Sequence, residues 1–175
     1  MSSSTTASAI EVVKRHMAAE DRQDVEQAVE CFTEDCYYEV PGIGVSLRGK
    51  REIKRWYEEL FRAVPDFRNT HERYWEVTER EAEQDRTTVF FEAGFEGTHR
   101  GTWMGWAPTN RSFSSAMLVR IPIAPDGLME AEIVYQDSAD IFMALGILPR
   151  LGSRREHALQ AVHRLRMRLP VIGTR

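Results

Sequence analysis

The chain of 175 residues has very little cysteine, because Cys31 and Cys36 are its only two. Small secreted domains that depend on disulfides carry many more, so we expect reduced thiols and a cytoplasmic location. The N-terminus MSSSTTAS has no basic segment followed by an apolar one, which argues against a secretory signal. No apolar run approaches the length of a transmembrane helix. These absences predict a cytoplasmic protein that has no membrane partner.

The sequence also lacks the motifs of most cofactor-dependent enzymes. It has no Gly-x-Ser-x-Gly elbow, no Walker loop and no dinucleotide fingerprint. The glycines between Gly42 and Gly49 do not have phosphate-loop spacing, so we interpret this run as a loop at a pocket mouth. The five histidines and two cysteines do not have metal-ligand spacing. We therefore predict no metal and no cofactor, which leaves acid/base chemistry in an apolar pocket.

The composition is typical of one globular domain, with 42% hydrophobic and 10% aromatic residues. We expect residues 1–8 to form a disordered tail, residues 9–149 the domain, and residues 150–175 a basic helical extension. This extension combines arginines with an apolar stripe of helical spacing. Because the whole chain has a net charge of −4, we expect the extension to pack on the body or a partner subunit, with no nucleic acid bound.

The hydrophobic pattern changes period along the chain. Helical spacing predicts two helices that meet at a bend within 9–32, and a third over 50–64 that ends before Pro65. A period of two predicts strands over 67–78, 87–96, 113–121 and 128–136, after an earlier strand at 36–41. Helices followed by an antiparallel meander indicate the α+β class.

The last predicted strand is the most informative. Met129, Ala131, Ile133 and Tyr135 form a mostly apolar face, and the opposite face, which includes Glu130, Glu132 and Gln136, is largely polar. Asp137 falls on the apolar face. An unpaired buried carboxylate costs several kcal/mol or more, so such a group is paired or shifted toward its neutral form, as in a general acid or base. The alternative is that Asp137 caps the next helix.

Another unusual segment is 97–106, which combines three glycines with His99, Trp103, Met104 and Trp106. Glycine permits a bulge or a close backbone approach, and the aromatic residues are suited to a binding wall. The segment Gly97-Thr98-His99-Arg100-Gly101-Thr102-Trp103-Met104-Gly105, then Pro108-Thr109-Asn110, Tyr135-Gln136-Asp137 and Leu145-Gly146-Ile147-Leu148-Pro149, resembles the SnoaL-like polyketide cyclases of the nuclear transport factor two-like superfamily.

The stretch from Phe32 to Pro41 and the step Arg48-Gly49-Lys50 also resemble this superfamily, so the resemblance covers about 10–149. It implies a cone-shaped α+β roll in which a curved antiparallel sheet and three helices enclose a deep apolar pocket, usually in a homodimer. It further implies that Asp137 occupies the position of an acid/base carboxylate at the end of the last strand, in agreement with its parity.

The resemblance implies a cofactor-independent cyclase or isomerase of secondary metabolism, for example in antibiotic biosynthesis, that acts on a small apolar polyketide-like or terpenoid intermediate. Asp137 would transfer the proton, His99 and Tyr38 would polarise an oxygen, and Tyr135 would orient the carboxylate. The candidates for the pocket wall are Phe91, Trp75, Trp103, Met104 and Met117. For each of them, as for both tyrosines, core packing is the alternative.

Two related activities fit less well. Val40 occupies the position before the proline of the first strand where ketosteroid isomerases carry their base. The triad of limonene epoxide hydrolase-like proteins needs an acidic partner on a neighbouring strand, where Glu92 and Glu96 have outward parity. The remaining alternatives are a non-catalytic ligand-binding or dimerisation module of the same fold, and epoxide hydrolysis by another arrangement.

Overall fold

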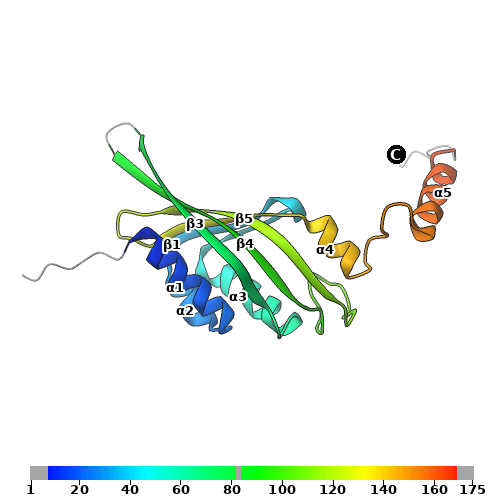
Figure 1. Cartoon of the computed structure of the whole chain (residues 1–175), viewed down its shortest axis with the longest axis horizontal. Coiled ribbons are helices and arrows are strands. Elements are labelled where there is room, and N and C mark those ends of the chain that lie inside the picture. The colour runs from blue at the N-terminus through cyan, green and yellow to red at the C-terminus, as the bar shows by residue number, and fades with distance from the viewer. Residues whose placement is uncertain (1–7, 82–83, 169–175) are drawn as a thin grey trace, which may run out of the picture.

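The computed structural model describes residues 8–81 and 84–168 and confirms the predicted α+β class (Figure 1). Apart from Ser8, the predicted N-terminal tail lies outside the described residues. The elements in chain order are α1 Ala9–Asp21, α2 Val25–Glu30, β1 Phe32–Val40, the 3-10 turn η1 Pro41–Ile43, β2 Val45–Arg48, α3 Gly49–Ala63, β3 Arg68–Glu81, β4 Gln84–Thr98, β5 Ser112–Ile123, β6 Met129–Gln136, α4 Ser138–Ala144 and α5 Arg154–Arg168.

The predicted bend between the first two helices is confirmed and has a local cause. Ser8 and Glu11 form a capping box that begins α1. Gln23 takes a positive φ of 56°, and the Asp24 side chain then accepts the Gln27 N–H at 3.1 Å to cap α2. The chain therefore turns sharply between two capped helices.

The sheet has six strands in the order β2-β1-β6-β5-β4-β3, and α1, α2 and α3 lie on one of its faces (Figure 1). All neighbouring pairs are antiparallel except β1 and β6, which run parallel. In that parallel pair Tyr38 is the register partner of Glu132. The first and last strands in the sequence, which are neighbours inside the sheet, therefore bring these two residues together from 94 positions apart.

The prediction that residues 42–49 form a loop at a pocket mouth is wrong in part. Val45–Arg48 forms β2, which pairs with β1, and Gly44 and Gly49 take positive φ values of 70° and 73° on either side of it. The glycines thus serve the two tight turns that flank a short edge strand.

Strand β4 alternates as the sequence predicts. Val89, Phe91, Ala93 and Phe95 are buried, whereas Glu92 is exposed and Glu96 is half-buried. Phe91 is fully buried, and its ring packs against Tyr74 with centroids 5.6 Å apart. Phe91 is therefore a core residue and does not line the pocket, which corrects its predicted role in substrate binding.

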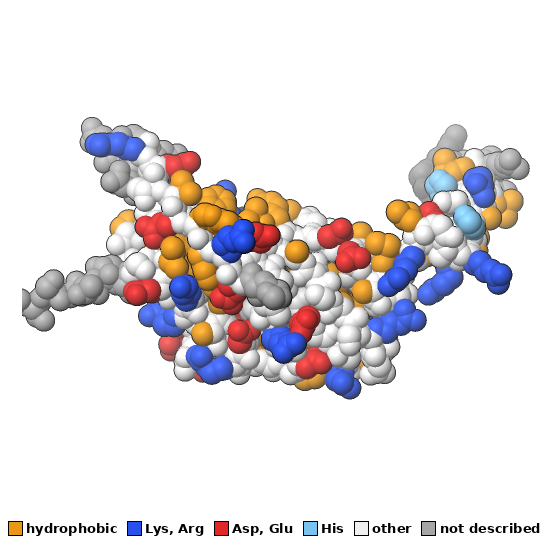
Figure 2. All heavy atoms as spheres, viewed as in Figure 1, with side chains coloured by type: hydrophobic (Ala, Val, Ile, Leu, Met, Phe, Trp, Pro, Cys, Tyr) orange, Lys and Arg blue, Asp and Glu red, His pale blue; other side chains and the backbone are white. Residues whose placement is uncertain are grey.

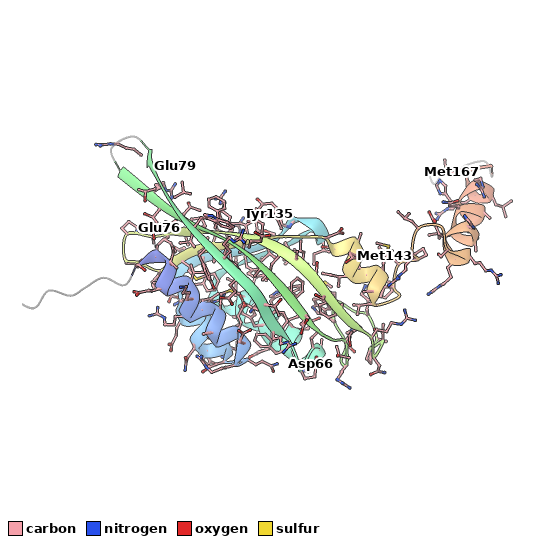
Figure 3. All side chains as sticks on the ribbon, in the orientation of Figure 1. Asp66, Glu76, Glu79, Tyr135, Met143 and Met167 are labelled. Carbon is pink, nitrogen blue, oxygen red and sulfur yellow. The ribbon has the colours of Figure 1, made fainter. Side chains whose placement is uncertain are left out.

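Strand β6 does not keep the parity that we predicted. Met129 belongs to the core, as predicted. The pairing of β5 with β6 is then irregular between Arg120 and Ile123. Beyond that irregularity, the residues of β6 that face the interior cavity are Glu132, Val134 and Gln136. Tyr135 is 49% exposed and lies on the sheet face away from the three helices (Figure 3). Because side chains alternate along a strand, one irregularity exchanges the two faces beyond it.

The outer face of the sheet, opposite the three helices, carries exposed apolar side chains. Trp75 is 41% exposed, and Val77, Leu118 and Tyr135 are exposed beside it or on neighbouring strands. The guanidinium of Arg73 lies 6.0 Å from the Trp75 ring. Trp75 is therefore on the wrong side of the sheet to bind a substrate in the pocket, contrary to the prediction.

The basic helical extension forms α5, away from the body (Figure 1), with Arg side chains gathered around it (Figure 2). Residues 169–175 of the predicted extension lie outside the described residues. Leu159, Val162 and Leu165 of its apolar stripe are exposed. Among the described helices none combines the length and apolar character needed to cross a bilayer.

The glycines of 97–106 allow a close approach between this segment and the end of α3. Arg100 and Gly101 both donate their backbone N–H to the Ala63 carbonyl, at 2.7 and 3.0 Å. A Cβ on Gly101 would lie 2.7 Å from the Arg62 carbonyl oxygen and 3.0 Å from the Ala63 Cα. Since both are backbone atoms, they could not move aside without shifting α3 or the segment.

We therefore expect Gly101→Ala to lower the free energy of unfolding by about 1–3 kcal/mol through this overpacking. Urea unfolding would measure the loss. Arg100→Ala, which truncates an exposed neighbouring side chain, should change the same free energy by less than about 0.5 kcal/mol. Equal values for the two variants would contradict the steric explanation.

Candidate active site

A narrow cavity lies between the helices and the inner face of the sheet. Most of its exposed wall is apolar, and the side chains that bring polar atoms to it are Glu20, Tyr38, Trp56, Tyr57, Trp103, Glu132 and Gln136. The space open to the centre of a water molecule is ≈ 40 Å³, which is room for a few waters. The expected apolar pocket is thus present, and a substrate of several rings would have to displace side chains of its wall.

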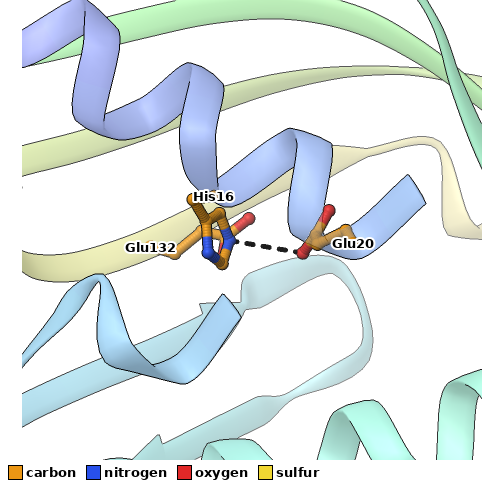
Figure 4. A group of neighbouring side chains, drawn as sticks. All are labelled: His16, Glu20 and Glu132. Atoms are coloured by element: carbon orange, nitrogen blue, oxygen red, sulfur yellow. Dashed lines mark hydrogen bonds and ion pairs between the residues drawn. The ribbon is translucent and has the colours of Figure 1, made fainter. Parts of the chain in front are cut away.

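A buried cluster of ionisable groups forms the polar end of this cavity (Figure 4). His16 Nε2 lies 3.2 Å from Glu132 Oε2 and 3.3 Å from Glu20 Oε1. Tyr57 donates its hydroxyl proton to Glu132 Oε2 at 2.8 Å, and its oxygen is 3.2 Å from His16 Nε2. Glu132 is only 3% exposed. Two carboxylates therefore face one imidazole in a nearly water-free environment.

The other nitrogen of His16 fixes how the ring is protonated. His16 Nδ1 lies 3.0 Å from the Ala28 carbonyl oxygen, which can only accept a hydrogen bond. Nδ1 therefore carries a proton, and Nε2 is left to face the carboxylates. When Nε2 is also protonated, the imidazolium donates toward Glu132 and Glu20.

The surroundings raise the pKa values of His16 and Glu132. Burial alone lowers the pKa of His16, but hydrogen bonds with Cys31, Glu132 and Glu20 raise it well above its usual value. Burial raises the pKa of Glu132, although the hydrogen bond with His16 acts in the other direction. Because the two groups share a hydrogen bond, they titrate as one coupled pair.

The same three residues have a spacing that could admit a metal ion. His16, Glu20 and Glu132 each offer one ligand atom, and these atoms lie within 4.8 Å of one another. The cluster is nevertheless hydrogen-bonded without an ion, since Tyr57 and His16 satisfy Glu132, and Asn69 Nδ2 donates to Glu20 at 3.3 Å. We therefore interpret it as a proton-holding group.

Tyr38 is the one predicted catalytic residue that the structure places at this site. It lies on β1 opposite Glu132, is buried, and lines the cavity. Burial, together with the nearby charges of Glu132 and Glu20, raises the pKa of the Tyr38 hydroxyl well above its usual value. Tyr38 thus stays protonated and available as a hydrogen-bond donor.

Asp137 does not lie in the interior, which corrects the central expectation from the sequence. It is exposed and is the N-cap of α4, where its Oδ1 accepts the Asp140 N–H at 3.1 Å. The capping alternative is therefore the one the structure shows. Tyr135, which was expected to orient this carboxylate, is exposed on the outer face of the sheet.

His99 is fully buried beside the cavity wall but is not among the cavity-lining residues. Its Nδ1 accepts the Thr109 backbone N–H at 3.3 Å, and its ring makes an edge contact with Trp103. Burial lowers the pKa of His99, so it is neutral. In this position His99 supports Trp103 and organises the segment between β4 and β5.

Three of the predicted wall residues have positions suited to that role. Trp103 and Met117 line the cavity, and Met104 lines a smaller adjoining cavity that shares Trp103 and Gln136 with the first. The Met104 backbone N–H donates to Glu59 Oε1 at 2.8 Å. The segment 97–106 therefore closes one end of the pocket, as its composition suggested.

His16, Glu20 and Glu132 were not among the site residues predicted from the sequence. A signal was available for the first two, because His16 and Glu20 are spaced i, i+4 on the same face of α1 as the buried Val12, Val13 and Met17. A histidine and a glutamate on the apolar face of a helix indicate a buried polar partner. For Glu132, the alternation predicted for the last strand indicated the outward, polar face, whereas the residue is buried.

The proton affinity of the cluster gives the folded protein a specific pH dependence. A pKa raised by folding contributes stability that is complete below the unfolded value and is lost as the pH rises through the folded value. We therefore expect the free energy of unfolding to fall as the pH rises above about 6.5, the unfolded value for histidine. In His16→Gln this decline should become shallower, and at pH 6.5 the variant should be less stable by about 3–5 kcal/mol.

Urea unfolding between pH 6.5 and 9 would measure both effects. His157→Gln, the same substitution at an exposed position of α5, is the matched control and should keep the decline of the unmodified protein. The explanation is wrong if His16→Gln and His157→Gln have the same pH dependence.

Comparison with known proteins agrees with this fold. The sequence pattern of the SnoaL-like polyketide cyclase family matches residues 10–142. No curated protein matches the chain.

Several solved structures share the fold at low sequence identity. AclR, a proposed hydroxylase from Streptomyces galilaeus, is 18% identical with a TM-score of 0.62 over 94% of this chain and 99% of its own. IdmH, a proposed polyketide cyclase from Streptomyces antibioticus, is 19% identical with a TM-score of 0.60 over 80% of this chain and 99% of its own. A proposed polyketide cyclase from Silicibacter is 16% identical with a TM-score of 0.65 over 78% and 93%.

Proposed function

The chain belongs to the SnoaL-like polyketide cyclase family, and we propose that it is a cyclase or isomerase in which Glu132, with His16 and Tyr57, moves a proton on a small apolar substrate. The observation that supports this most is the position of Glu132, a buried carboxyl group that lines an apolar cavity and shares a hydrogen bond with an imidazole. A carboxyl group whose pKa is raised by burial is suited to accept and return a proton near neutral pH.

Glu132 would remove a proton from a carbon next to a carbonyl group. His16 would stabilise the carboxylate before the transfer, and Tyr57, which donates to the same oxygen, would hold it in place. Tyr38, opposite Glu132 in the strand pairing, would donate a hydrogen bond to the enolate oxygen as negative charge develops there. The chemistry needs no oxidant, because the proton is the only group transferred.

Ring closure and isomerisation share this first step. In ring closure the enolate carbon attacks an electrophilic carbon of the same molecule, and the oxygen that gains negative charge takes up a proton. In isomerisation the proton returns to another carbon of the conjugated system. The catalytic residues proposed from the sequence, Asp137, His99 and Tyr135, have no such access to the cavity, so Glu132 replaces Asp137 in the proposal.

Hydrogen–deuterium exchange at C2 of 1-tetralone in D₂O, followed by NMR, tests this proposal without the natural substrate. We expect the protein to accelerate exchange and Glu132→Gln to lower the accelerated rate by about 10²–10⁴-fold, since glutamine cannot accept the proton.

Asp137→Asn is the matched control, because it also replaces a carboxylate by an amide and asparagine caps a helix as well as aspartate does. It should exchange at the rate of the unmodified protein. A loss of exchange in Asp137→Asn, with full exchange in Glu132→Gln, would restore the assignment made from the sequence and overturn the one made here.

A second proposal concerns assembly. We propose that the outer face of the sheet packs against a second copy of the chain, because Trp75, Val77, Leu118 and Tyr135 leave a band of apolar surface there. Leu118 and Tyr135 are register partners on the two neighbouring strands β5 and β6. Arg120 and Glu130 lie in the same hollowed face, so each copy offers both signs of charge to the other.

Leu118→Glu should therefore convert a dimer to a monomer, as measured by sedimentation velocity at micromolar concentration, because it places a second carboxylate beside Glu92 on the face that would be buried. Leu159→Glu makes the same substitution at an exposed position of α5 and should leave the dimer intact. A monomeric unmodified protein, or a Leu118→Glu variant that remains dimeric, would refute this assignment of the face.

A further inference from the structure

The cavity is bordered by hydrogen-bond donors that have no protein partner among the described residues. Trp56 Nε1 and Trp103 Nε1 are both buried without a hydrogen bond of normal geometry, and both residues line the cavity. The Trp56 N–H faces the Tyr38 oxygen and acts to lower the pKa of that hydroxyl, against the larger effect of burial. Ser138 Oγ, also buried without a partner, belongs to the adjoining cavity that shares Trp103 and Gln136 with the first. Unpaired polar atoms therefore border both this cavity and the one that adjoins it.

An unpaired buried N–H group costs about 1–3 kcal/mol, so two in one cavity wall require an explanation. An indole N–H can only donate, and its complement must therefore be an acceptor such as a carbonyl oxygen. Glu20 and Glu132 lie in the same cavity, and their charge disfavours an anionic acceptor such as a carboxylate. The complementary ligand is a neutral oxygenated compound.

The two indoles are held in place by independent contacts. The Trp103 ring stacks on Phe113 with centroids 6.0 Å apart, and its backbone exchanges two hydrogen bonds with Trp106. Trp56 projects from α3 and packs against the Tyr38 ring, also with centroids 6.0 Å apart. Since neither ring depends on the other for its position, both donors are in place before a ligand arrives.

From these contacts we propose that Trp56 and Trp103 form a carbonyl-binding subsite, which selects a neutral cyclic ketone or quinone over the hydrocarbon of the same shape. The subsite rests on the proposed function only because its two tryptophans line the same cavity as Glu132. The carbonyl oxygen binds at the indole N–H groups, the apolar rings pack against Phe95 and Met117, and an adjacent C–H is presented to Glu132. The hydrogen bonds from the indole N–H groups withdraw electron density from the carbonyl and make the adjacent C–H more acidic.

The experiment compares two probes of nearly equal shape, 1-tetralone and tetralin, which differ in one carbonyl group. Isothermal titration calorimetry measures the dissociation constant of each for the unmodified protein and for Trp56→Phe and Trp103→Phe, which remove the N–H and keep an aromatic ring. We expect tetralone to bind at least about tenfold tighter than tetralin, and each substitution to weaken tetralone binding about five- to tenfold while tetralin changes little.

Tetralin serves as the internal control for loss of packing, because a variant that merely loosens the wall weakens both probes alike. Trp106→Phe, at a side chain that is half exposed and outside the cavity, is the matched control and should leave both constants unchanged. Equal affinity of the two probes for the unmodified protein, or parallel losses in Trp56→Phe and Trp103→Phe, overturns the subsite.

Failure of the subsite and failure of the proposed catalysis give different results. Glu132→Gln should lose deuterium exchange and keep the preference for tetralone over tetralin, which supports the subsite and the catalytic assignment together. A preference for tetralone in a protein that never accelerates exchange supports the subsite and refutes the catalysis. Exchange that depends on Glu132 without any preference between the probes refutes the subsite alone.

Discussion

The structure depends on one electrostatic constraint, which is that two buried carboxylates must share one imidazole. Glu20 and His16 come from α1 and Glu132 comes from β6, so the hydrogen bonds between them join the first helix to the last strand. Removing water from two carboxylates is costly unless each is paired, and Tyr57 from α3 supplies the remaining donor. The contact therefore holds two helices against the sheet, and it is also the most polar point of the interior.

The same constraint gives the cavity its chemical character. A core filled with apolar side chains would be more stable, because burying charge gains little even when the pairing is good. The cluster instead borders a cavity whose wall also has indole donors without protein hydrogen bonds of normal geometry. A carboxyl group and fixed donors that border the same apolar space can together orient a small ketone.

Much of the fold could be predicted from local pattern. Spacing of apolar residues located α1 to α3, and alternation on β4 identified Val89, Phe91, Ala93 and Phe95 as an inward face. The glycines beside Trp103 indicated a close approach of backbone, which the contact between Gly101 and Ala63 shows. The site was predicted less well. Tyr38, Trp103 and Met117 were placed in the pocket correctly, whereas Asp137, Tyr135 and Trp75 lie outside it.

By itself, the sequence determined the periodicities, and with them the helices, the strands, the α+β class and the resemblance to a family. Only the tertiary structure decided which carboxylate is buried. Side chains alternate with every residue of a strand, so one irregular step between β5 and β6 moves Glu132 inward and leaves Tyr135 outside. Pairing of β1 with β6 then sets Tyr38 opposite Glu132, across a separation in sequence that no local pattern reports.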